Sequence, residues 1–356
     1  MTTPSGAPHG HRHAASRLRE ILIGYQITQV LYVAARLNLA DHLRKPMTAT
    51  DLARATGADP DTLRFLLRIL VGYGVFERGG DLYATNALGQ LLESDRSDSL
   101  LPTVIATGKE RYSSWGSLLR TVLTGRPAFV QDNGVELHDF YAAHPAAATP
   151  FNGAMAALTN SMVDNLIDAY DFALHTRVVE VGGGLGVFMA ELLHRYPTLH
   201  GVILDLPHVI AEAAQELPPR ILDERLTLIS GDARQNVPEN ADLYLIKMVL
   251  CDFSDDEALK ILRSVRKAIP DDGTLVIFDK IRTEIHDDEI SRRTVMSALN
   301  LLVMTGGRER SENEYRHLLT RAGFKVVDVM GTEALDGEIH RVVAKPGEAV
   351  PLSSGE

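Results

Sequence analysis

A chain of 356 residues, 45% of them hydrophobic, can bury a large core and is long enough for about two domains. Its formal net charge of -11 argues against binding to nucleic acid or an anionic membrane surface, because phosphate contacts need clustered Lys and Arg. The single cysteine excludes an intramolecular disulfide. The sequence shows neither a signal peptide nor an apolar run of about 18 residues, so we expect a cytoplasmic protein.

Both ends of the chain lack apolar periodicity. Residues 1–16 are rich in Gly, Pro and His, and we expect a disordered tail there. The three histidines of this tail have no fourth ligand or fixed geometry, which argues against a metal site at His9, His11 and His13. Residues 347–356 are expected to be equally loose.

The first predicted domain spans residues 17–100 and follows a winged-helix pattern. A helix is expected over residues 17–43, where apolar side chains recur with helical spacing. A short helix, a longer helix and two short strands that turn at Gly79 and Gly80 come next. The expected limits of those two helices are a cap at Thr50 with an end at Gly57, and a start at Asp59 or Asp61 with an end near Tyr73.

A winged helix raises the possibility of DNA binding. A DNA-reading helix should present a basic stripe, but the second helix offers only Arg64 and Arg68 among Leu, Phe, Ile and Val. We therefore expect this domain to serve packing or dimerisation.

Residues 101–172 are expected to be a helical region that contributes to a substrate pocket. One stripe in it recurs with helical spacing and consists of Phe151, Met155, Leu158, Met162 and Leu166. Such a stripe is usually core, although its methionines also suit an adaptable pocket for an aromatic ligand. Both interpretations hold together.

Beyond about residue 173 the pattern changes to strands alternating with helices, which predicts an α/β domain over residues 173–346. The last two strands are close in sequence, so we expect a hairpin and one antiparallel edge strand on a mostly parallel seven-stranded sheet. The expected strands are residues 177–181, 201–205, 225–229, 241–247, 273–279, 324–330 and 339–344.

The first of these strands leads into a glycine loop, VVEVGGGLG. Gly182 and Gly184 allow a close approach of ligand to backbone, but the dinucleotide fingerprint would need glycine where Val187 stands. An acid, Glu180, precedes the loop and suits a cationic ligand. The next two strands end in Asp205 and Asp232, which are placed to bind a ribose diol and an adenine amino group. This set specifies S-adenosylmethionine well and NAD poorly.

The motifs VVEVGGGLG, ILDLP, SGDA, LIKMVLCDFSDDEALKIL and GGRERSENEY resemble those of the class I S-adenosylmethionine-dependent methyltransferases. More narrowly, residues 17–346 resemble the small-molecule O-methyltransferases of the plant caffeate type and their bacterial relatives acting on polyketides and other aromatics. The resemblance implies a Rossmann-like domain, a winged-helix domain that builds a homodimer, and S-adenosyl-L-methionine as cofactor.

The resemblance also implies roles for individual residues. Those expected at the cofactor are Glu180, Gly182, Gly184, Asp205, Leu206, Asp232, Ala233 and Lys247. Those expected in the substrate pocket are Phe151, Met155, Met162, Asn300 and Met304. Asp279, where the family usually has glutamate, and Glu309 correspond to the two acids that flank the family's catalytic histidine, and Asp252 follows the position of that histidine.

The histidine itself is absent, because its position is held by Cys251. A thiol titrates near 8.5, and the adjacent Asp252 raises that pKa further. A thiolate beside a sulfonium methyl would also risk being methylated itself. We therefore interpret Cys251 as a neutral, small wall of the pocket. His286 is the one histidine placed to substitute as a base, although a solvated loop residue is the preferred interpretation.

These observations predict a methyl transfer to a hydroxyl of a small aromatic or polyketide-like natural product, of the kind found in antibiotic biosynthesis. Positioning of the acceptor would replace most of what the missing base supplies. Two alternatives stay open. One is C-methylation of an electron-rich phenol ring. The other is a protein of the same fold that binds the cofactor without methylating.

Overall fold

The computed structural model describes residues 8–282 and 289–347, without the side chains of residues 8–12, 223, 289–291 and 293. The chain divides into two compact units, one ending at Tyr112 and the other beginning at Ser113. The division falls inside the region expected to be a helical linker. Within the described ranges, no helix is long and apolar enough to cross a membrane.

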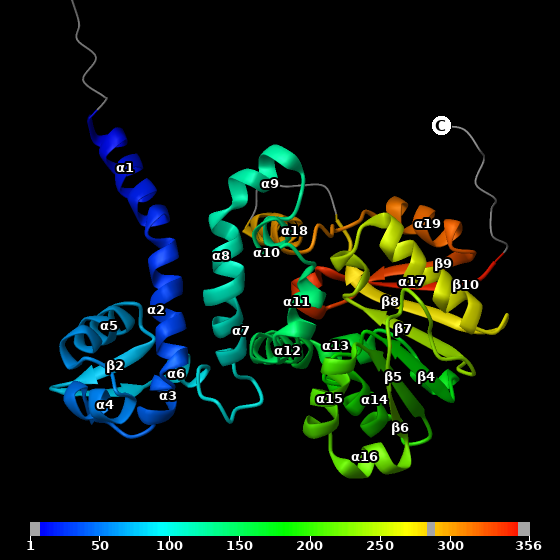
Figure 1. The fold of residues 1–356 in the computed structure, drawn as a ribbon, viewed down its shortest axis with the longest axis horizontal. Helices are drawn as coiled ribbons and strands as arrows, with labels where there is room; N and C mark the ends of the chain where they lie inside the picture. Colours follow the sequence, from blue (N-terminus) through cyan, green and yellow to red (C-terminus); the bar gives the residue numbers. More distant parts are fainter. Residues whose placement is uncertain (1–7, 283–288, 348–356) are drawn as a thin grey trace, which may run out of the picture. The chain divides into compact units, whose positions relative to one another are not determined.

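The first unit is mainly helical and carries a small three-stranded sheet of order β1-β3-β2, which confirms the predicted two helices followed by a wing (Figure 1). Its strands are β1 (Met47–Thr48), β2 (Phe76–Gly79) and β3 (Leu82–Thr85). Its helices are α1 (Pro8–Leu22), α2 (Gly24–Arg36), α3 (Leu39–His42), α4 (Ala49–Thr56), α5 (Pro60–Gly72), α6 (Ala87–Gln90), α7 (Leu101–Ala106) and the π-helical turn η1 (Thr107–Arg111).

Three expectations for this unit need correction. The predicted disordered start is wrong from Pro8 onward, because α1 begins there. The single helix over residues 17–43 is instead three helices, and Asn38 has a left-handed backbone before the last of them. The cap of α4 is Thr48 rather than Thr50, since the Thr48 side chain accepts from the Asp51 amide.

The apolar residues of this unit fall into two groups. Residues such as Leu52, Leu67 and Leu70 form a buried core between the helices and the wing. A second group is exposed and includes Ile21, Tyr25, Phe65, Ile69 and Tyr73. Large exposed apolar side chains in such number are typical of a surface that another chain covers.

The second unit is built on a seven-stranded sheet of order β6-β5-β4-β7-β8-β10-β9 (Figure 1). The predicted mostly parallel sheet is confirmed, and its antiparallel strand is β10, which pairs with β8 on one side and with the edge strand β9 on the other. The strands are β4 (Arg177–Val181), β5 (His200–Asp205), β6 (Leu226–Ser230), β7 (Leu243–Lys247), β8 (Thr274–Lys280), β9 (Phe324–Gly331) and β10 (Ile339–Pro346).

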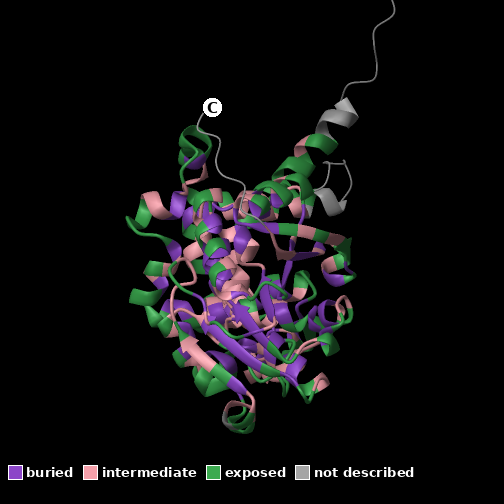
Figure 2. Cartoon of the chain, turned by 90° about the vertical axis from the view of Figure 1, so that its right-hand side faces the viewer, coloured by how far each residue is buried: buried purple, intermediate pink, exposed green. Residues whose placement is uncertain are grey.

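Helices cover both faces of this sheet, so its central strands β5, β4, β7 and β8 are buried almost throughout (Figure 2). Alternate residues of β4 serve the two faces: Val179 packs into the core beneath α17 (Asp255–Ala268) and α19 (Glu312–Arg321), whereas Val178 packs into the opposite core. That opposite core lies beneath α13 (Val163–Asp168), α14 (Val187–Arg195), α15 (Pro207–Glu216) and α16 (Pro219–Glu224).

The remaining helices form a layer with its own apolar core, which joins segments far apart in sequence. They are α8 (Tyr112–Gly116), α9 (Leu118–Thr124), α10 (Ala128–Asn133), α11 (Leu137–Ala143), α12 (Pro145–Asn160) and α18 (Glu289–Met304). Two short turns, η3 (Leu250–Asp252) and the segment around Gly307, lie beyond the carboxyl ends of β7 and β8. Open α/β sheets bind their ligands outside the carboxyl ends of their strands.

Candidate functional site

The glycine loop after β4 brings a backbone amide onto the end of β5. Gly182 has a φ of +73°, and a Cβ there would lie 2.5 Å from Val249 Cγ2, so the position needs glycine on both counts. The Gly184 amide donates to Asp205 Oδ2 at 2.7 Å, and the Leu206 amide donates to Oδ1 at 2.7 Å. The Asp205 carboxylate is thereby fixed at the mouth of the loop.

Glu180 on β4 is fully buried, and neither of its carboxylate oxygens has a hydrogen-bond donor among the described residues. Burial raises the pKa of Glu180 to about 7, an effect that Lys247 opposes and Asp205 reinforces. A buried carboxylate without donors is costly, so this position is suited to a cationic or hydrogen-bond-donating ligand.

Lys247 ends β7 and brings a buried positive charge to the same strand edge. Its Nζ donates to Thr159 Oγ1 at 3.0 Å. Burial lowers the pKa of Lys247, whereas the fields of Glu180, Asp205 and Asp279 raise it. The positive charge of Lys247 therefore acts both on the carboxylates near the glycine loop and on Asp279 near the carboxyl end of β8.

Asp232 follows β6 and is engaged by a neighbouring guanidinium. The Arg234 Nη2 donates to Asp232 Oδ2 at 2.7 Å, and burial of Asp232 is outweighed by these bonds, so its pKa lies below the usual range. The Arg234 guanidinium also lies 5.9 Å from the centre of the Phe253 ring. The acid expected to bind the adenine amino group therefore already accepts hydrogen bonds from the Arg234 side chain. Its neighbour Ala233 packs against the core beneath α17.

His138 is a residue that the sequence did not single out. Its ring stacks on Phe253 with 5.8 Å between ring centres, and its Nε2 is buried without a partner among the described residues. Burial and the nearby Arg234 lower the pKa of His138 to about 4, so the ring is neutral at pH 7. A lone His in an apolar helix carries no pattern that would have indicated this position.

Cys251 is buried in η3, beyond the end of β7. Burial raises the pKa of the thiol well above its ordinary value, and the nearby charges of Asp279 and Asp252 raise it further. The thiol is therefore protonated at pH 7, and it lies close enough to Asp279 for the two groups to shift each other's pKa. The interpretation of Cys251 as a pocket wall stays a prediction. The raised pKa leaves little thiolate at neutral pH, which argues against Cys251 as the base.

The two acids expected to flank the family's histidine have opposite surroundings. Asp279 is 1% exposed and has two donors, the Tyr315 hydroxyl at 2.7 Å and the Lys280 amide at 2.9 Å. Burial still raises the pKa of Asp279, although these donors favour its charged form. Asp279 is thus a carboxylate whose oxygens are already occupied by the protein.

Glu309 is 3% exposed, and among the described residues neither of its oxygens has a hydrogen-bonded donor. Ser297 on α18 lies close enough to favour the ionised form, but its geometry makes no hydrogen bond to either oxygen. Burial raises the pKa of Glu309, whereas the Lys280 ammonium, which is paired with Glu338 at 2.7 Å, lowers it. This carboxylate is available to a ligand.

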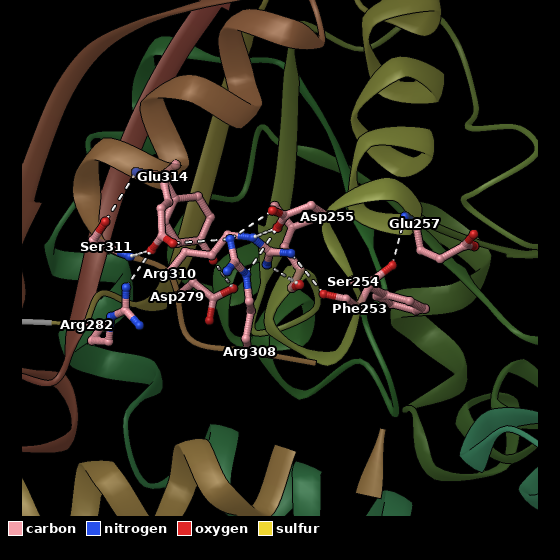
Figure 3. A network of polar contacts seen from close by, with 12 residues as sticks. Phe253, Ser254, Asp255, Glu257, Asp279, Arg282, Arg308, Arg310, Ser311 and Glu314 are labelled. Atoms are coloured by element: carbon pink, nitrogen blue, oxygen red, sulfur yellow. Dashed lines mark hydrogen bonds and ion pairs between the residues drawn. The ribbon is translucent and has the colours of Figure 1, made fainter. Parts of the chain in front are cut away.

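A buried arginine, Arg310, fixes the Cys251 turn to the segment that carries Glu309; Figure 3 shows it beside Phe253 and Asp255. The Arg310 guanidinium donates to the carbonyls of Leu250 at 2.7 Å and Phe253 at 2.9 Å, and to Asp255 at 2.9 Å. Its backbone oxygen accepts from the Arg282 amide at the end of β8. Arg310 therefore holds both flanks of η3, and sequence analysis did not identify it.

The expected pocket residues are only partly gathered. Phe151 and Met304 belong to one apolar cluster, in which Phe151 stacks on Tyr141 with 4.7 Å between ring centres. Asn300 is tied to that cluster because the Trp115 indole donates to its amide oxygen at 3.0 Å. Met155 is on the same helix as Phe151 and is partly exposed.

Met162 differs from the other expected pocket residues, because it packs in the core beneath α13 and α14. For that side chain the core interpretation is correct. His286 lies outside the described residues, as do the side chains of His9 and His11. Among the described residues, no group of three His, Cys, Asp or Glu side chains is arranged to hold a metal.

The family follows from two matches that together span both units. An O-methyltransferase domain model matches residues 115–325, and an O-methyltransferase dimerisation domain model matches residues 20–95. The chain belongs to the O-methyltransferase family. Its cofactor is S-adenosylmethionine, and it is a methyltransferase.

Similar proteins act on varied small molecules. Phenazine O-methyltransferase PhzM of Lysobacter antibioticus is 33% identical over 89% of this chain and 93% of the relative. The mitomycin biosynthesis 6-O-methyltransferase of Streptomyces lavendulae is 36% identical over 91% and 93%. The crystal structure of LaPhzM superposes with a TM-score of 0.89 at 32% identity, covering 94% of this chain and 99% of that one. The family also includes an 8-amino-8-demethylriboflavin N,N-dimethyltransferase of Streptomyces davaonensis, 33% identical over 92% and 94%.

Proposed function

We propose that this enzyme transfers the methyl group of S-adenosylmethionine to a phenolic hydroxyl of a small aromatic natural product, and that Glu309 accepts the proton of that hydroxyl. The observation that carries the proposal is the buried Glu309 carboxylate, which has no donor among the described residues and lies next to the turn of Cys251. An acceptor hydroxyl that donates to Glu309 would satisfy this carboxylate.

The residues at the carboxyl ends of β4, β5 and β6 suit the chemical groups of the cofactor. When bound, S-adenosylmethionine supplies a methyl group on a positively charged sulfur, together with an amine and a ribose diol. Glu180 has two free oxygens for a cationic or donating group, and Asp205 is fixed by two amides with lone pairs remaining for ribose hydroxyls. Asp232 and Arg234 form a joint polar edge beside Phe253 for the adenine end. Gly182, Gly184, Leu206, Ala233 and Lys247 complete the proposed cofactor set.

Replacement of the family's histidine by Cys251 does not prevent the reaction. Ionising a phenol of pKa near 10 at pH 7 costs about 4 kcal/mol. Holding the hydroxyl in line with the methyl contributes about 7–11 kcal/mol. Positioning is therefore the larger effect. Glu309, whose pKa burial raises, is a better proton acceptor at neutral pH than an ordinary glutamate.

The aromatic substrate class is supported by the residues and by the relatives. Phe151, Tyr141 and Met304 form an apolar cluster with aromatic faces, and Asn300 brings an amide to it. Similar proteins are described as methyltransferases of phenazine, mitomycin and 3-amino-4-hydroxybenzoate, all of which are aromatic or quinone-like molecules.

The test is a product analysis. The enzyme is incubated with S-adenosylmethionine carrying a labelled methyl group and a panel of phenols, aminophenols and hydroxylated tricyclic aromatics. We expect S-adenosylhomocysteine release and label on oxygen, shown by the chemical shift of the new methyl. Label on a ring carbon or on nitrogen would replace the O-methyl assignment. Absence of S-adenosylhomocysteine with every substrate would favour the cofactor-binding alternative.

We further propose that the chain forms a homodimer through the first unit. The support is the match of residues 20–95 to a dimerisation domain and the exposed apolar side chains of that unit, such as Ile21, Phe65 and Tyr73. Light scattering at micromolar concentration should give the mass of two chains. A monomer at that concentration would contradict the proposal.

A further inference from the structure

Tyr315 on α19 is fully buried, and its hydroxyl reaches across to Asp279 on β8, 36 residues earlier in the chain. The hydroxyl donates to Asp279 Oδ2 at 2.7 Å. The guanidinium of Arg310 lies 6.0 Å from the centre of the Tyr315 ring, so the ring is held beneath the arginine that fixes η3. No role of this tyrosine follows from the proposed cofactor or acceptor contacts.

Three elements meet at Asp279. Tyr315 approaches from α19, the Cys251 thiol approaches from η3, and the Lys280 amide belongs to β8 itself. The Tyr315 hydroxyl and the Lys280 amide bind different oxygens, so the carboxylate is held at both ends. A carboxylate with bonds at both oxygens cannot rotate toward an added ligand without breaking one of them.

The backbone of Cys251 packs directly against the segment that carries Glu309. A Cβ at Gly307 would lie only 2.1 Å from the Cys251 carbonyl oxygen, so the two backbones are in close contact. Glu309 follows two residues later. Tyr315 therefore holds Asp279 by a hydrogen bond, Asp279 lies near the Cys251 side chain, and the Cys251 backbone contacts the segment that carries Glu309.

We propose that Tyr315 is a positioning residue for methyl transfer, which holds Asp279 in place so that Glu309 alone faces the acceptor hydroxyl. The inference rests on the proposed function. Without the Tyr315 hydroxyl, Asp279 has a free oxygen and competes with Glu309 for the hydroxyl, which turns the acceptor away from the methyl group. Tyr315 itself touches neither substrate nor cofactor in this proposal.

The test is Tyr315→Phe in the full chain, with Tyr244→Phe as the matched control. Tyr244 is equally buried, and its hydroxyl donates to the carbonyls of Pro238 at 2.8 Å and Ala268 at 3.1 Å, neither of which is a proposed cofactor or substrate residue. We expect the two variants to lose similar thermal stability, because each loses one buried hydroxyl. Only Tyr315→Phe should lower kcat, by about tenfold, with the Kd for S-adenosylmethionine unchanged within about twofold.

A second comparison asks whether Tyr315 acts through Asp279. Asp279→Asn should lower kcat to a similar extent, and adding Tyr315→Phe to it should lower kcat less than about twofold further, since the carboxylate through which Tyr315 acts is already lost. Independent, multiplying losses would overturn the inference, as would equal kcat values for Tyr315→Phe and Tyr244→Phe. A wild-type enzyme that makes no methylated product would overturn the proposed function as well.

Discussion

Two regions at the same edge of the sheet pair a satisfied carboxylate with an unsatisfied one. At the glycine loop, Asp205 accepts from two backbone amides, whereas Glu180 has no donor among the described residues. At the carboxyl end of β8, Asp279 accepts from Tyr315 and Lys280, whereas Glu309 again has no donor among the described residues. The regions differ in residue types and in distance along the chain, but they share this division.

The comparison teaches how a buried site fixes one acid by its own donors and leaves the other acid's oxygens to a ligand. A buried carboxylate without donors costs free energy that the fold has to supply elsewhere. Acids whose surroundings differ in this way are the ones to which different roles are assigned. The division therefore predicts different consequences of substitution: an unsatisfied acid loses only its contact with the ligand, whereas a satisfied acid also releases the amides or hydroxyl that hold it in place.

The largest effect is the loss of kcat expected when Glu309, the proposed proton acceptor, is substituted. Glu309→Gln removes the proposed proton acceptor and keeps the size of the side chain, so kcat should fall by about 10²–10⁴-fold. Asp279→Asn, which removes a carboxylate already held by the protein, should lower kcat by only about tenfold. The measurement is turnover at saturating cofactor, with calorimetric affinity for S-adenosylmethionine as control. Equal losses for the two variants would remove the distinction between the acids.

The next effect concerns cofactor affinity at the glycine loop. Asp205→Ala should weaken S-adenosylmethionine binding by well over about tenfold, because the ribose hydroxyls lose a fixed acceptor. Asp242→Ala is the matched control, since Asp242 also accepts from two backbone amides, those of Thr176 and Arg177, at the opposite edge of the sheet. Calorimetry measures both. Unchanged affinity of Asp205→Ala would contradict the ribose assignment.

A smaller effect follows from the pKa of Glu180, which burial raises from the ordinary 4.5 to about 7. Below pH 7 the carboxyl is protonated, and a cation that needs the carboxylate has to displace that proton. Affinity for S-adenosylmethionine should therefore rise up to about tenfold from pH 6 to pH 8 and then level off, with proton release on binding. Glu180→Gln should remove the pH dependence.

The same raised pKa makes the stability of the free enzyme change with pH in the opposite direction to its cofactor affinity. The folded state binds the proton of Glu180 more tightly than the unfolded state does, so this group stabilises the fold fully below about pH 4.5, and its contribution is lost as pH rises toward 7. Thermal unfolding without cofactor should show this loss between those values. An affinity for S-adenosylmethionine that falls with rising pH would contradict the role of Glu180.

The smallest effect is expected for Cys251→Ala. The thiol is buried and protonated, so its removal should cost only a few-fold in turnover through looser packing. The pH profile should follow the ionisation of the substrate and shift between two phenols of different acidity. A collapse of the rate with cofactor affinity intact would show that the thiol takes part in the chemistry.

Much of the fold was predictable because its pattern is local. The expected strand at residues 177–181 has the limits of β4, and the others lie within about two residues of theirs, since short apolar runs between helices leave little freedom. The cap of α4 was misplaced because Thr48 and Thr50 are the same residue type, and only geometry shows which one accepts from Asp51.

The contacts that distinguish the acids were not predictable. Arg310 stands among charged neighbours, which indicates a solvated segment, yet its guanidinium is fully buried against Leu250 and Phe253. The contact of Tyr315 with Asp279 depends on how α19 packs on the sheet, which no spacing in the sequence expresses. Sequence placed both acids near Cys251 by resemblance, but the structure alone shows that one is saturated and the other is not.

The close approach of Gly307 to Cys251 has a consequence for how this enzyme can evolve. Any side chain at 307 would collide with the carbonyl oxygen of Cys251 and with the backbone of Asp252, so that position tolerates no inherited variation while the loop keeps its path. Position 251 is different, because an exchange of its side chain leaves both backbones where they are. A lineage can therefore gain or lose a base at 251 by a single substitution, within a frame that a neighbouring glycine keeps constant.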